Sequence, residues 1–168
     1  AVPERDLDAP LLEKALALLG DDPALEALLD ELGSVARPVL RLDGKEGSYA
    51  DTDIALEGPF TVETWIRLDP GIGNDDGILG RPGGADFNFH DGLFRVYGGP
   101  EHGDRIIAKR KMTPELWTHV ATTRDGDGDL RIYLDGELDT AECRPLEEPL
   151  TGLDIGRVSP AKGTGAMF

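Results

Sequence analysis

The stretch WTHVATTRDGDGDLRIYLDGE, residues 117–137, decides the fold class of this chain. Both flanks alternate apolar or β-branched residues with polar ones, which is the period-2 pattern of half-buried β-strands. Between them, DGDGD at residues 125–129 combines aspartate, whose side chain caps its own turn, with glycine, which adopts positive φ without strain. The stretch therefore predicts two antiparallel strands joined by a tight turn.

The three alternating aspartates also invite comparison with the calcium-binding loop of an EF-hand. That loop needs a glycine at its sixth position and a bidentate glutamate at its twelfth. Counted from Asp125, these positions hold Leu130 and Gly136, and the flanks lack the helical pattern of an EF-hand. The hairpin interpretation is therefore preferred.

Short strands of the same kind recur from Pro38 onward, separated by turns that contain glycine. The clearest is FTVETWIRLD at residues 60–69, where one face is apolar and the other mixed. Both tryptophans, Trp65 and Trp117, lie in such segments, and their patterns assign them to core or framework positions. About ten strands, with no alternation of strand and helix, predict an all-β, two-sheet antiparallel sandwich or jelly roll.

The first part of the chain follows a helical period instead. Two leucine-rich segments each end at a glycine, Gly20 or Gly33, and the second has Pro23 at its first helical position. The sequence thus predicts a helical hairpin over residues 1–36 and a β-domain over residues 37–168. Because helices this short are marginal alone, their leucine faces must pack on the β-domain or belong to a longer helical array. A role in assembly or docking is one open hypothesis.

The bulk composition narrows the classes of partner. A net charge of −16 argues against nucleic acid and anionic membrane surfaces, which attract clustered lysine and arginine. A single cysteine, Cys143, excludes a disulfide framework and cysteine-based zinc motifs within this chain. No apolar run reaches the roughly 20 residues that would span a bilayer, so membrane insertion is not expected.

An acidic motif raises the alternative of an enzyme. Glu137, Asp139 and Glu142 match E-x-D-x-x-E, the carboxylate pattern of laminarinase-type glycoside hydrolases, where two carboxylates act as nucleophile and general acid. Against this, the motif directly follows a turn, and aromatic residues, which serve as sugar platforms, make up only 6% of the chain. We assign no catalytic residue, and the hydrolase stays an alternative.

Taken together, several segments resemble the laminin-G-like, concanavalin A-like jelly roll that is found in many secreted bacterial proteins. The resemblance extends from about Val39 to the C-terminus, and its most specific part is the predicted hairpin. The segments that carry it are VLRLDGKEGSYADT (39–52), GPFTVETWIRLDP (58–70), DGLFRVYGG (91–99), residues 112–138 and LDIGR (153–157).

This resemblance implies a non-catalytic binding or spacer module of a larger exported protein, secreted or in the cell envelope. Such a module contacts carbohydrate or neighbouring protein domains. Members of the family often hold one structural calcium ion at a sandwich edge, and Asp43 is the matching residue here. The family's last strand should begin just after GTGAMF at residues 163–168, so we expect a longer chain or a partner to supply it. Asp43 alone cannot provide the six to eight oxygens that calcium takes.

Overall fold

The computed structural model describes residues 39–74, 76–141, 143–159 and 164–168. The helical hairpin predicted for residues 1–36 lies outside these ranges and stays a prediction, as does the boundary that separates it from the β-domain. Among the described residues, no helix is long and apolar enough to cross a membrane.

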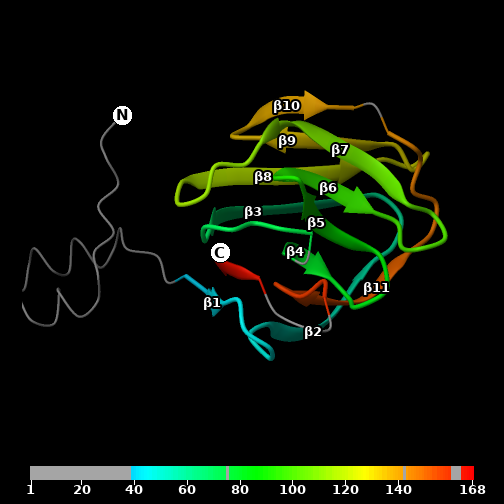
Figure 1. Ribbon diagram of the computed structural model, residues 1–168. Coiled ribbons are helices and arrows are strands. Elements are labelled where there is room, and N and C mark those ends of the chain that lie inside the picture. The colour runs from blue at the N-terminus through cyan, green and yellow to red at the C-terminus, as the bar shows by residue number, and fades with distance from the viewer. Residues whose placement is uncertain (1–38, 75, 142, 160–163) are drawn as a thin grey trace, which may run out of the picture. The chain divides into compact units, whose positions relative to one another are not determined.

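The described residues form twelve strands in two six-stranded antiparallel sheets (Figure 1). The first sheet has the order β1 (Arg41–Asp43), β12 (Gly165–Met167), β3 (Phe60–Leu68), β8 (Trp117–Arg124), β9 (Leu130–Leu134) and β10 (Glu137–Thr140). The second has the order β2 (Ala50–Leu56), β11 (Leu150–Ile155), β4 (Gly77–Gly80), β5 (Asp86–His90), β6 (Leu93–Tyr97) and β7 (Asp104–Lys111). The predicted all-β sandwich is confirmed.

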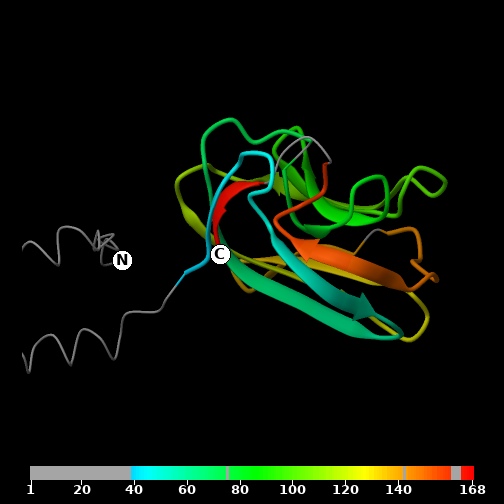
Figure 2. The ribbon, with the colours of Figure 1, turned by 90° about the horizontal axis from the view of Figure 1, so that it is seen from below.

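The two sheets pack through the apolar faces that strand alternation creates, and Figure 2 shows them as two layers. An edge-to-face contact joins them, with the rings of Phe60 in β3 and Phe87 in β5 at 6.1 Å. The residues that fill the core from the first sheet include Ile66, Leu68, Val120, Leu130 and Ile132, and those from the second include Phe87, Phe89, Phe94, Val96 and Ile106.

The hairpin that decides the fold pairs β8 with β9 in continuous register, from Val120 opposite Leu134 to Arg124 opposite Leu130. Strand β3 pairs with the other edge of β8 over its whole length. Of the two roles expected for Trp65, core or framework, the core position is wrong. Trp65 lies on the outward face of β3 and is 56% exposed, because the inward positions of this strand belong to its immediate neighbours, Thr64 and Ile66.

The end of the chain differs from the sequence-based expectation. Residues Gly165–Met167, which the sequence analysis left outside any strand, form β12 between β1 and β3. This strand pairs with β3 only at Arg67 and Leu68. The other residues of β3 have no strand on that side among those described, so the source of any further strand stays a prediction.

Candidate functional site

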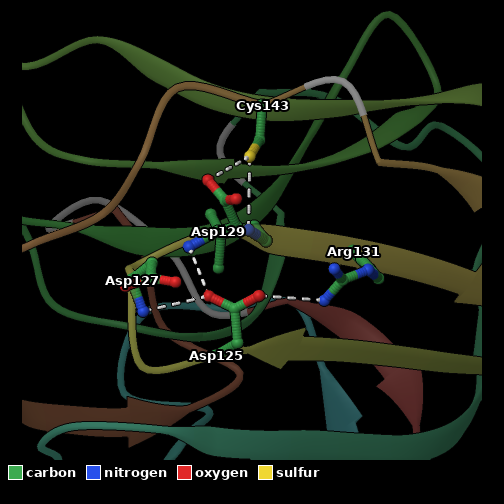
Figure 3. Close-up of polar contacts among 6 residues, drawn as sticks. Asp125, Asp127, Asp129, Arg131 and Cys143 are labelled. Carbon is green, nitrogen blue, oxygen red and sulfur yellow. Dashed lines mark hydrogen bonds and ion pairs between the residues drawn. The ribbon is translucent and has the colours of Figure 1, made fainter.

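The DGDGD turn holds its aspartates apart rather than around an ion (Figure 3). One carboxylate oxygen of Asp125 accepts the backbone N–H groups of Asp127 and Asp129, and the other binds Arg131 at 3.2 Å. The carboxylate of Asp129 is oriented instead toward the thiol of Cys143, 3.8 Å away. The turn therefore stabilises its own backbone, as the hairpin interpretation predicts.

The predicted calcium ligand Asp43 lies at a sandwich corner, where it lines a cavity of about 180 Å³ with Asp69 and Asp76. Two of these carboxylates already face cations. Lys45 lies 2.7 Å from Asp43, and its hydrogen bond is the main reason that the pKa of Asp43 falls to about 2. Both oxygens of Asp69 bind the guanidinium of Arg41, at 2.8 and 2.9 Å.

This corner does not fit calcium in the arrangement described. In the ranges that the structure covers, no three histidine, cysteine, aspartate or glutamate side chains lie close enough to bind one ion. Here Lys45 and Arg41 supply the positive charge that faces Asp43 and Asp69. Calcium at Asp43 stays a prediction.

The acidic motif of the hydrolase alternative is split by its strand. Glu137 is exposed in β10, whereas the carboxylate of Asp139 accepts the backbone N–H groups of Lys109 and Arg110 in β7, at 2.6 and 3.1 Å. Asp139 thus links the edge strands of the two sheets. Glu142 lies outside the described residues. The described part of the motif has a structural role rather than the free pair of carboxylates that glycoside hydrolysis requires.

The outer face of the second sheet carries a polar network that the sequence analysis did not single out. In β6, Arg95 is only 12% exposed, and three neighbours fix its guanidinium. Its Nε donates to Asn88 of β5 and its Nη1 to Asp104 of β7, both at 2.6 Å, and its carbon lies 5.0 Å from the ring centre of Tyr97. These side chains are preorganised donors and acceptors on rigid strands.

Asp86, which opposes Tyr97 in the strand register, is the unusual member of this face. It is 6% exposed, and its Oδ1 has no hydrogen-bond partner among the described residues. Burial raises its pKa from 3.8 to about 7; the charge of Arg95 opposes this rise, and that of Asp104 adds to it. Gly80 makes the burial possible, since a Cβ there would lie 2.4 Å from the Cβ of Asp86. Perturbed carboxyl groups of this kind often mark functional sites.

A hollow of about 370 Å³ adjoins this network. Its walls are the β4–β5 turn, the β6–β7 turn and the segment that leads into β11, so it opens where Asp86 begins its strand and Tyr97 ends its own. Arg81, Glu101, His102 and Glu148 line it. Small-molecule sites commonly occupy roughly 300–1,000 Å³ and combine a few polar groups with apolar walls.

Neighbouring side chains hold Glu148 in place at the wall of the hollow. Glu148 has two nitrogen partners, His102 Nε2 at 3.5 Å and Arg105 Nη2 at 3.2 Å. The backbone of Gly98 leaves room for them, because a Cβ there would lie 2.8 Å from Nε of Arg105 and 2.9 Å from Cβ of His102. Gly99 has a φ of 92°, which other residues adopt at a cost.

The chemistry of the hollow suits a neutral ligand rich in hydroxyl groups. Carboxylate oxygens accept, guanidinium and imidazole N–H groups donate, and the leucine and proline side chains of the lining offer an apolar surface. Sequence reasoning missed this site because its residues come from three separate turns and share no spacing. The one available signal was the alternation of Asp86, Asn88 and His90 with phenylalanines, which places polar groups on an outer sheet face.

Comparison with known proteins agrees with this fold. Residues 43–153 match the laminin-G-type profile of the concanavalin A-like lectin/glucanases superfamily, so the chain belongs to this family. The resemblance inferred from the sequence is thereby confirmed. No curated protein matches the chain in sequence.

Three solved structures share the sandwich. A candidate carbohydrate-binding protein from Bacteroides ovatus is 19% identical with a TM-score of 0.55, over 76% of this chain and 42% of its own length. Domain 4 of AbnA, a GH43 extracellular arabinanase from Geobacillus stearothermophilus, bound to arabinotriose, is 15% identical with a TM-score of 0.51, over 77% and 80%. A mutant sialidase of Trypanosoma rangeli is 12% identical with a TM-score of 0.51, over 77% and 26%.

These likenesses establish the fold and not the ligand, because all three identities are low. The chain spans less than half of the Bacteroides ovatus protein and about a quarter of the sialidase. Carbohydrate-binding proteins and a glycan-processing enzyme both occur among them.

We predict that Asp86→Asn stabilises the protein more at pH 8 than at pH 5. The folded state binds more protons at Asp86 than the unfolded state between pH 3.8 and about 7, so stability falls as the pH rises through this window. The amide stays neutral and avoids a buried charge, which should add roughly 1–3 kcal/mol at pH 8. Thermal unfolding at both pH values measures the difference. Asp53→Asn, at an exposed strand position, is the control, and an equal gain at pH 5 would contradict the assignment.

Calcium binding at Asp43 is tested by thermal unfolding of chelator-treated protein with and without millimolar calcium. Since Lys45 and Arg41 already neutralise two of the three carboxylates, we expect no change in Tm. A rise in Tm that Asp43→Asn abolishes would establish the ion and show that it displaces the side chains of Lys45 and Arg41 from the carboxylates.

Proposed function

We propose that this chain is a non-catalytic carbohydrate-binding module of a larger exported protein. The observation that carries the proposal is the hollow, which is lined by the carboxylate of Glu148, the imidazole of His102 and the guanidinium of Arg81. Glu148 is held by His102 and Arg105. The volume of the hollow and its polar lining match what a short oligosaccharide needs. Fold neighbours that bind carbohydrate support this proposal by analogy.

Each lining group has a definite role in this proposal. Glu148 accepts hydrogen bonds from sugar hydroxyl groups, while His102 and Arg105 hold it in position. Arg81 donates, and the ring of His102 offers its face to the sugar. Because these groups sit on turns anchored by rigid strands, little conformational entropy is lost on binding.

We expect the protein to bind arabinan or a β-glucan, and Glu148→Gln to weaken that binding. Loss of a charged hydrogen-bond partner costs about 1.5–3 kcal/mol, or roughly 10–100-fold in Kd. Affinity electrophoresis on immobilised polysaccharides, followed by titration calorimetry with arabinotriose and laminari-oligosaccharides, measures it. Glu147→Gln, an exposed neighbour outside the hollow, is the matched control. Equal affinities for both variants would remove the hollow from the proposal.

The hydrolase alternative has its own test. If Glu137 is not a catalytic group, neither the protein nor its Glu137→Gln variant should release reducing sugar from laminarin, while both bind polysaccharide equally. The physical reason is that Asp139, its nearest described carboxylate in the motif, is already occupied by two backbone N–H groups. Activity that disappears in Glu137→Gln would establish an enzyme instead.

A further inference from the structure

An exposed tryptophan stands out on the first sheet. Trp65 projects from the outward face of β3 and is 56% exposed. A tryptophan carries one of the largest apolar surfaces of any side chain, and leaving it in water forgoes a substantial gain from burial. An exposed indole on a rigid strand is therefore an informative feature, unlike a singly exposed aliphatic residue.

The neighbours of Trp65 fix the indole and surround it with polar groups. His119 of β8 is its partner in the strand register, and the two rings lie 5.3 Å apart, inclined at 56°. Nε2 of His119 is in turn 3.7 Å from a carboxylate oxygen of Glu63, two positions before Trp65. On the other side, Arg67 Nε donates to the carbonyl of Glu115 at 3.1 Å.

We propose that Trp65 is a stacking platform for a sugar ring, and thus a second carbohydrate contact. A sugar ring presents C–H groups on one face and hydroxyl groups at its rim, which matches an indole face bordered by Glu63, His119 and Arg67. A protein partner would be expected to meet a more continuous apolar patch, because charged residues are depleted in the core of such interfaces. The inference rests on the proposed carbohydrate-binding function.

Trp65 and the hollow lie on different sheets. β3 belongs to the first sheet, whereas the turns that form the hollow belong to the second. The sheets pack through their inner faces, and Trp65 lies on the outer face of the first (Figure 2). The two contacts therefore cannot share one sugar ring. A module with two separate contacts holds two glycan segments and gains avidity on a polysaccharide without any new interaction.

The test compares Trp65→Ala with Leu138→Ala in the full chain. Leu138 is an equally exposed apolar residue, also at 56%, on β10 of the same sheet, so its truncation removes comparable surface without an aromatic ring. We expect Trp65→Ala to reduce retardation on arabinan or laminarin gels at least fivefold and to lower the calorimetric stoichiometry for oligosaccharide from two to one. Leu138→Ala should change neither. Unfolding curves confirm that both variants fold.

The outcomes separate this inference from the proposed function. If Glu148→Gln loses binding and Trp65→Ala does not, the second contact is refuted and the hollow stands. If only Trp65→Ala loses binding, the hollow is refuted as a sugar site and the platform is the primary one. If the wild type binds none of these glycans, both fail. Self-association that Trp65→Ala abolishes would show that a second copy covers the indole, which also overturns the platform.

Discussion

The packing of two apolar sheet faces against each other is the constraint on which the rest of the molecule depends. Each strand has one side chain in two directed inward, and the inward set must exclude water from a layer shared by both sheets. Phe87, Phe89 and Phe94 from the second sheet and Ile66 and Ile132 from the first meet this requirement, all at or below 1% exposure. Every alternate residue is thereby directed outward, whatever its chemistry.

That outward set is where the functional chemistry lies. The alternation that buries Phe87 and Phe89 places Asp86 and Asn88 on the outer face, beside Arg95 from the next strand. The same rule in β3 exposes Trp65. A polar group on an outer face normally meets water. Asp86 does not, because Gly80 has no side chain and both Asp86 and Val158 pack directly against its backbone. The raised pKa of Asp86 follows from this local crowding.

The chain is strongly acidic, but several of its carboxylates are bound by nearby groups of the protein. Asp125 binds its own turn, Asp139 links β10 to β7, and Asp43 and Asp69 face Lys45 and Arg41. Carboxylates that are already engaged by N–H groups or cations are poor candidates for metal binding or nucleophilic catalysis. The hollow is different, because Glu148 stays 45% exposed although His102 and Arg105 bind it.

The sequence by itself determined the sandwich, because strand periodicity and turn residues are local properties that one segment is enough to reveal. It determined the hairpin at residues 125–129 for the same reason, down to the capping role of Asp125. Only the tertiary structure decided which outward residues gather into a site, since the turns before β5, after β6 and before β11 meet solely through sheet order. It also decided that Asp43 meets Lys45, that Trp65 is exposed and that residues 165–167 enter the first sheet. The place of residues 165–167 depends on long-range strand pairing, whose partners leave no spacing in the sequence.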